Sequence, residues 1–193
     1  MPNRQPPLPD IWLVSDERND AALERILARL PRGSGLIFRH YHLPPGERRA
    51  RFAALARAAR RRRHLVVLSA AAREARAWGA DGAYGAPGKL ARGPALPRLA
   101  TVHSLRELGA AHRARARAAV LSPVFPTRSH PGARTLGPVR FRLLAARARV
   151  PVIALGGMTA HRARAIGTGK WAAIGGGNRG LAKWPTGTFP LHS

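Results

Sequence analysis

Short, fully apolar runs alternate along the chain with longer stretches rich in Ala and Arg. A run that is apolar throughout is typical of a strand buried on both faces, as in a parallel sheet. The apolar runs predict strands at Ile11–Val14, Gly35–Phe38, Leu65–Leu68, 99–102, Ala118–Leu121, 150–155 and 171–174, with a weaker one at 81–84.

The Ala/Arg stretches between these runs predict helices at about 20–30, 47–63, 71–78, 140–147 and 159–166. Ser104 and Glu107 have the spacing of a capping box, which predicts a further helix start. Thr159 is the expected N-cap of the 159–166 helix. Residues 85–97 are rich in Gly and Pro and predict a loop.

This order gives about eight strand–helix units in one chain. Eight such units predict an α/β fold, a minimal TIM (β/α)8 barrel, with function at the carboxyl ends of the strands. No long helix is predicted after the last strand, so we expect a shortened C-terminal end. A doubly wound open sheet is the alternative. We assign 1–9 to a flexible N-terminus, 10–183 to a single barrel domain and 184–193 to a tail.

Composition narrows the class of protein. The chain has 193 residues, 45% of them apolar, which is enough for one folded domain. No apolar run approaches the roughly 18 residues of a membrane helix, and the N-terminus MPNRQPPLPD lacks the apolar stretch of a signal peptide. We therefore expect a cytoplasmic protein without membrane contact. Cysteine is absent, which excludes disulfides, thiolate catalysis and cysteine metal sites.

The net charge of +25 raises the alternative of a nucleic-acid binder. Most cations are arginines that alternate with Ala on predicted helices, and no aromatic residues are interleaved for base stacking. Solvated helix faces are the simpler interpretation. All acidic residues lie at or before Glu107, so chemistry in 108–193 must use His, hydroxyls, Arg, Lys or backbone amides.

Three loops rich in Gly and hydroxyl residues follow the last three predicted strands. They read SPVFPTRSHPG from Ser122, ALGGMT from Ala154 and IGGGNRG from Ile174. Loops after strands seven and eight form the usual phosphate site of such barrels, and glycine lets backbone amides approach an anion. Ordinary glycine turns are the alternative. The pattern predicts a site for a phosphorylated small molecule.

These loops resemble those of the thiamine phosphate synthases and the related thiazole tautomerases. That family carries GPVFPT-x-T-K-P after strand six and a Gly-Gly-Ile/Met-Thr turn after strand seven. IWLVSD, GADGAYG and TVHSLRE also resemble the family segments LYLVTD, GADGVHLG and STHTLEE. The resemblance covers about residues 11–178, and the strand-six motif is its most specific part.

The resemblance implies an enzyme of thiamine biosynthesis, a transferase that joins a hydroxymethyl-pyrimidine pyrophosphate to a thiazole phosphate. The thiazole phosphate would be held by Thr127, Ser129, Gly156, Gly157 and Gly177. The pyrophosphate would be met by Arg39, Thr101 and Lys89. The catalytic candidates are Arg39, His103 and His130, the last standing where the family has a lysine.

The chain departs from the family at the magnesium site. The third strand of the synthases ends in Asn-Asp, but here it ends in Ser69 and Ala70, and Lys89 stands where the second metal aspartate belongs. Magnesium needs hard oxygen ligands, usually one or two carboxylates. We therefore expect Mg²⁺ from the family but assign it no residue, and a fixed cation is the alternative means of stabilising a leaving pyrophosphate.

Other functions stay open. The tautomerase branch has a catalytic histidine just before VF, where this chain has Pro123; His40, His103 or His130 could act as acid or base instead. The remaining alternatives are a non-catalytic protein that binds a phosphorylated ligand and a basic nucleic-acid binder. The aromatic residues Phe38, Tyr41 and Tyr84 are expected to fill space left by lost polar groups. Family members are often oligomeric, so a homo-oligomer is also open.

Overall fold

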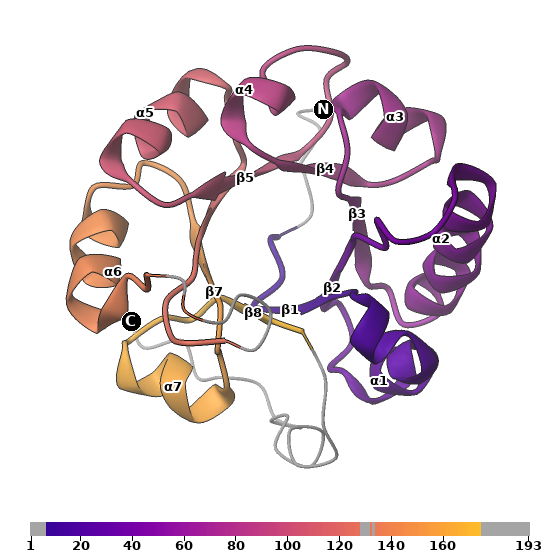
Figure 1. The fold of residues 1–193 in the computed structure, drawn as a ribbon, viewed down its shortest axis with the longest axis horizontal. Helices are drawn as coiled ribbons and strands as arrows, with labels where there is room; N and C mark the ends of the chain where they lie inside the picture. Colours follow the sequence, from indigo (N-terminus) through magenta and orange to yellow (C-terminus); the bar gives the residue numbers. More distant parts are fainter. Residues whose placement is uncertain (1–6, 128–131, 133, 175–193) are drawn as a thin grey trace.

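The computed structural model describes residues 7–127, 132 and 134–174 as a ring of parallel strands surrounded by helices (Figure 1). In these residues the strands are β1 Ile11–Val14, β2 Gly35–Phe38, β3 Leu65–Leu68, β4 Gly82–Gly85, β5 Arg98–Val102, β6 Ala118–Leu121, β7 Val152–Leu155 and β8 Trp171–Ala173. The helices are η1 Glu17–Ala22 (a 3₁₀ helix), α1 Leu23–Arg29, α2 Pro45–Arg60, α3 Ala72–Ala77, α4 Pro87–Leu90, α5 Leu105–Arg113, α6 Gly137–Ala146 and α7 Ala160–Ala165.

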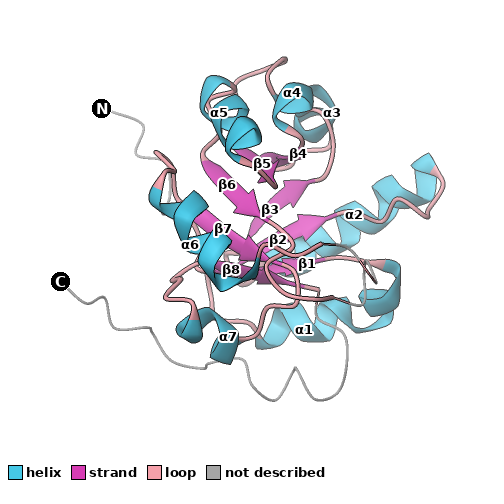
Figure 2. Ribbon diagram, turned by 60° about the vertical axis from the view of Figure 1, so that its left-hand side comes forward, coloured by secondary structure: helices cyan, strands magenta, loops and turns pink. Residues whose placement is uncertain are grey.

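Every strand pairs in parallel with its neighbours in sequence order, and β1 pairs with β8 to close the ring. The predicted (β/α)8 barrel is therefore confirmed, and the open sheet is excluded. Figure 2 shows the helices packed around the outside of the strands. The predicted shortening of the C-terminal end lies outside the described residues.

The barrel interior is filled by one cluster of side chains, separate from the larger cluster between strands and helices. At its amino end, Trp12 lies in register with Gly35 on one neighbouring strand and Ala172 on the other. The Trp12 indole N–H donates to the carbonyl of Pro9, at 2.8 Å. A Cβ at position 35 would overlap the indole ring. Glycine at this position therefore provides the room that the largest interior side chain needs.

Apart from shifts of a few residues at element ends, the observed elements differ from the predicted ones in three places. The helix predicted at 20–30 is divided into the 3₁₀ helix η1, which begins at Glu17, and the α-helix α1. The loop predicted at 85–97 contains the short helix α4, which begins with Pro87 in the first turn, where a missing N–H is tolerated. The predicted capping box at Ser104 is formed only in part. The Ser104 hydroxyl accepts from the Glu107 N–H, but the Glu107 carboxylate accepts from the backbone N–H of His103.

Across the described part of the chain, every helix is too short or too polar to traverse a lipid bilayer.

We predict that Gly35→Ala destabilises the barrel by about 2–3 kcal/mol, because the added methyl group must displace a fully buried indole. Thermal and urea unfolding would measure the loss. Gly46→Ala in α2 is the matched control, since a Cβ there meets nothing within 4 Å. Equal stability of the two variants would contradict the proposed packing of Trp12.

Candidate functional site at the carboxyl end of the barrel

A cavity of about 1080 Å³ opens at the carboxyl ends of the strands. Its walls come from η1, from the ends of β4, β5, β7 and β8, and from the loops after β2, β3, β6 and β7. The polar side chains among the lining residues are Arg18, Arg39, Tyr41, Ser69, Tyr84, Thr101, His103, Ser122, Thr127 and Thr159. This is the end of the barrel at which the fold predicts function.

One wall is formed by the β6 loop packed against the glycine turn after β7. The Val124 N–H donates to the Leu155 carbonyl at 2.9 Å, and the Phe125 N–H donates to the Gly156 carbonyl at 3.1 Å. Gly156 and Gly157 have φ values of +97° and +60°. A Cβ on Gly156 would lie 2.7 Å from Cα of Pro123, and one on Gly157 would lie 2.5 Å from the Pro126 carbonyl oxygen.

These glycines therefore have a structural role that sequence reasoning missed. The sequence pattern predicts that they let amides approach an anion, and the structure shows that they also let the two loops touch. Arg162 joins them further, since its guanidinium donates to the Gly157 carbonyl at 2.5 Å and lies over the Phe125 ring. The two loops form one packed wall, which holds Thr127 at the cavity.

The structure brings together several of the residues singled out from the sequence. Thr127, Gly156 and Gly157 line the side of the cavity near β6 and β7, while Arg39, Thr101 and His103 line other parts of it. Lys89 is exposed on α4 and is not among the lining residues. The remaining predicted residues, Ser129, His130 and Gly177, lie outside the described residues.

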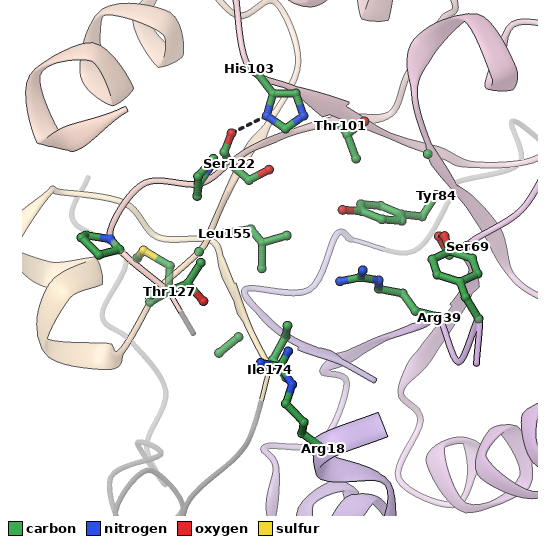
Figure 3. A pocket seen from close by; sticks show the side chains of 18 of the residues that line it. Arg18, Arg39, Ser69, Tyr84, Thr101, His103, Ser122, Thr127, Leu155 and Ile174 are labelled. Atoms are coloured by element: carbon green, nitrogen blue, oxygen red, sulfur yellow. Dashed lines mark hydrogen bonds between the residues drawn. The ribbon is translucent and has the colours of Figure 1, made fainter. Parts of the chain in front are cut away.

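His103 lies exposed at the rim of the cavity, next to the β6 loop (Figure 3). Its Nδ1 is hydrogen bonded to the Ser122 carbonyl oxygen, as the dashed line in Figure 3 shows. Because a carbonyl oxygen only accepts, Nδ1 carries the proton. In the neutral ring, Nε2 therefore has a free lone pair that can take a proton.

His40, in contrast, is buried outside the cavity. Its side chain bridges Ser15 Oγ and Asp20 Oδ1, each at 2.8 Å, and the residue is 1% exposed. Ser15 Oγ accepts the Arg39 N–H at 2.8 Å, and Asp20 is also held by the Arg51 guanidinium. The structure therefore places His40 in a supporting hydrogen-bond network and not among the groups that can meet a ligand.

This network and Arg48 fix the backbone of Arg39. Arg48 donates from Nε to the Arg39 carbonyl at 2.9 Å, and its terminal nitrogens bind the Ser69 carbonyl and the Glu74 carboxylate. The Arg39 side chain extends into the cavity beside Tyr84 (Figure 3). In the sequence Arg48 is one arginine of an Ala/Arg stretch, so spacing alone could not reveal its role.

Tyr84 projects from β4 into the boundary between the barrel interior and the cavity. Burial raises the pKa of its hydroxyl to about 12, although the nearby Arg39 charge acts in the opposite direction. The phenol is therefore protonated at neutral pH and can donate a hydrogen bond. The neighbouring Tyr41 is mostly exposed, and its hydroxyl is bonded to Ser69 Oγ. Of the aromatic residues expected to fill space, Tyr84 alone combines burial with a hydroxyl at the cavity.

The cavity does not fit a magnesium ion. None of its described lining residues is Asp or Glu, and the described residues contain no group of three potential metal ligands. The nearest sequence candidate, Asp16, caps η1 and pairs with Arg18. Hydroxyls and guanidinium groups do not form the carboxylate set that Mg²⁺ requires, whereas they bind anions well.

Comparisons with known proteins agree with this fold. Residues 11–175 match the family model described as thiamine monophosphate synthase. No curated protein sequence matches the chain. Thiamine phosphate pyrophosphorylase from Pyrococcus furiosus has a similar structure, with 24% identity, a TM-score of 0.76, and coverage of 90% of this chain and 91% of that one.

Two further solved structures share the fold at lower identity. Thiamine phosphate pyrophosphorylase from Bacteroides thetaiotaomicron is 14% identical, with a TM-score of 0.57 and coverage of 86% of this chain and 82% of that one. A 3-hexulose-6-phosphate synthase is also 14% identical, with a TM-score of 0.63 and coverage of 90% and 95%.

We predict that acidification destabilises the protein through His40. Burial lowers the pKa of His40 below its ordinary 6.5, against the opposite effect of Asp20. The folded state then binds fewer protons than the unfolded chain. The contribution of His40 to the free energy of unfolding is therefore fully present above about pH 6.5 and is lost as the pH falls below that value. The loss from this residue is at most about 2 kcal/mol between pH 6.5 and 5.

Urea unfolding at pH 7 and at pH 5 would measure this loss. His40→Asn is the informative variant, because Asn tolerates the left-handed backbone at this position, where φ is 42°. The variant should lose less stability than the parent between the two pH values. Burial also lowers the pKa of His64. Because His64 is present in both proteins, its effect on stability is the same in each and does not change the comparison. Equal losses would contradict the role of His40.

Proposed function

Because the chain belongs to the thiamine monophosphate synthase family, we propose that its cavity binds a phosphorylated thiazole and joins it to a hydroxymethyl-pyrimidine pyrophosphate. The product would be thiamine phosphate, which makes the protein an enzyme of thiamine biosynthesis. The observation that carries the proposal is the wall formed by the β6 loop and the glycine turn after β7, which holds Thr127, Gly156 and Gly157 at the cavity.

The groups that line the cavity support this proposal. In the proposed step, the C–O bond between the pyrimidine methylene and the pyrophosphate breaks, and the pyrophosphate leaves with the electron pair. The thiazole nitrogen then uses its lone pair to form the C–N bond with the methylene carbon. Arg39, which lines the cavity, would stabilise the charge that develops on the leaving oxygen. The β6–β7 wall would hold the thiazole phosphate and so orient the attacking nitrogen.

We predict that Thr127→Val weakens thiazole phosphate binding about tenfold, because it removes a hydroxyl from a nearly unchanged shape. Isothermal titration calorimetry would give the affinity, and chromatography of thiamine phosphate would give the rate of its formation. Thr168→Val is the matched control, since the Thr168 hydroxyl binds the Lys170 carbonyl outside the cavity. Absence of thiazole phosphate binding by the parent protein would reject the proposed function.

The position of His103 favours a second candidate, a proton transfer within a thiazole phosphate. The tautomerases have a catalytic histidine at the position of Pro123. In this chain His103 is hydrogen bonded to the carbonyl of Ser122, the residue directly before Pro123. Its Nε2 could remove a proton from one position of the thiazole and return it to another. No other reactant is needed for such an isomerisation.

For this candidate we predict that His103→Gln lowers the rate of proton transfer at least 100-fold, since Gln can hydrogen bond but cannot act as a base. Incorporation of deuterium from heavy water into thiazole phosphate, followed by NMR, would measure the rate. His161→Gln on exposed α7 is the control. If the parent protein incorporates no deuterium, the tautomerase candidate is excluded and the synthase proposal is unaffected.

A further inference from the structure

Three acidic residues on elements around the cavity are already bound to structural partners. Asp16 caps η1 and pairs with Arg18, and Glu74 pairs with Arg48. Asp20 binds both His40 and Arg51. A divalent cation entering the cavity would therefore meet the Arg39 guanidinium, and no carboxylate among the described lining residues would bind the cation.

Arg39 combines a backbone that is held in place with a guanidinium that is available to an anion. Its backbone N–H and carbonyl are both hydrogen bonded, to Ser15 Oγ and to Arg48 Nε. Its guanidinium extends into the cavity, and it forms no ion pair with a carboxylate of the described chain. A planar guanidinium binds phosphate oxygens with two parallel hydrogen bonds.

Tyr84 provides a second donor beside the first. The residue is 8% exposed, and its hydroxyl is not hydrogen bonded to any other described residue. Figure 3 shows the phenol and the Arg39 guanidinium extending from neighbouring positions into the same space. A hydroxyl that faces a cavity and has no partner among the described residues can donate its hydrogen bond to a ligand that accepts it. A phosphate oxygen is such an acceptor. A metal cation is not, because a donating O–H directs its positive hydrogen toward the ligand.

From these observations we infer that the cavity binds the pyrophosphate group of its ligand directly, through the Arg39 guanidinium and the Tyr84 hydroxyl, with no divalent metal between protein and ligand. The inference rests on the proposed function for the identity of the ligand. The two donors take the place of the carboxylates and magnesium that the family resemblance implies. Tyr84 is then a specificity-determining residue on the pyrophosphate side of the site.

The test is calorimetric titration of inorganic pyrophosphate into the full-length protein, once in EDTA and once in excess Mg²⁺, at about 0.15 M salt. We expect one pyrophosphate per chain, bound in EDTA at least as tightly as in Mg²⁺. Tyr84→Phe should weaken binding about tenfold, and Arg39→Gln on the order of 100-fold. Arg57→Gln on exposed α2 removes the same charge away from the cavity and should leave the affinity unchanged.

Several outcomes would overturn the inference. One is binding that requires Mg²⁺ or is tightened more than tenfold by it. Another is an unchanged affinity in Tyr84→Phe. Binding of several pyrophosphates per chain, weakened equally by Arg57→Gln and Arg39→Gln, would assign the effect to the basic surface. Titration of thiazole phosphate in parallel separates the two proposals: if it binds while pyrophosphate does not, only the present inference fails, whereas loss of thiazole phosphate binding rejects the proposed function.

Discussion

The interior of a closed eight-stranded barrel has a fixed width, and filling it is the constraint on which the rest of this structure depends. Trp12 fills the amino end because its two register neighbours, Gly35 and Ala172, are small. Tyr84 belongs both to the interior cluster and to the lining of the cavity. The top of the packed interior is therefore the floor of the site, and the same packing that stabilises the barrel sets the depth of the cavity.

The strand order and the barrel could be predicted because a continuous apolar run indicates a strand that is buried on both faces. The wall after β6 and β7 could be predicted in part, since its motif is local in sequence. What stayed hidden depends on contacts between distant segments. Nothing near Gly156 in the sequence indicates that Pro123 packs against it, and the partner of His40 is Asp20, on another unit of the barrel. Composition likewise could not distinguish Arg48 from the other arginines of its helix.

The charge balance has a consequence for the site. The chain has 34 Lys and Arg residues and only 9 Asp and Glu residues, so most cations have no acidic residue to pair with. Described ion pairs involve Asp10, Asp16, Asp20, Glu24, Glu74 and Asp81, and these hold together helices and loops. None of the acidic residues lines the described cavity, whose charged lining groups are Arg18 and Arg39, so its electric field favours anions.

The site has two sides, the β6–β7 wall and the opposite side that carries Arg39, and they are built by different means. This difference explains why the sequence resembles the family at the wall and departs from it on the opposite side. The β6–β7 wall depends on backbone contact that only glycine permits at Gly156 and Gly157, so side-chain substitution there would break the wall itself. The opposite side depends on side chains projecting from a backbone that Ser15 and Arg48 hold. Its hydrogen-bonding groups can be replaced without moving that backbone. A change from metal-bound to direct anion recognition is thus compatible with the fold on this side alone.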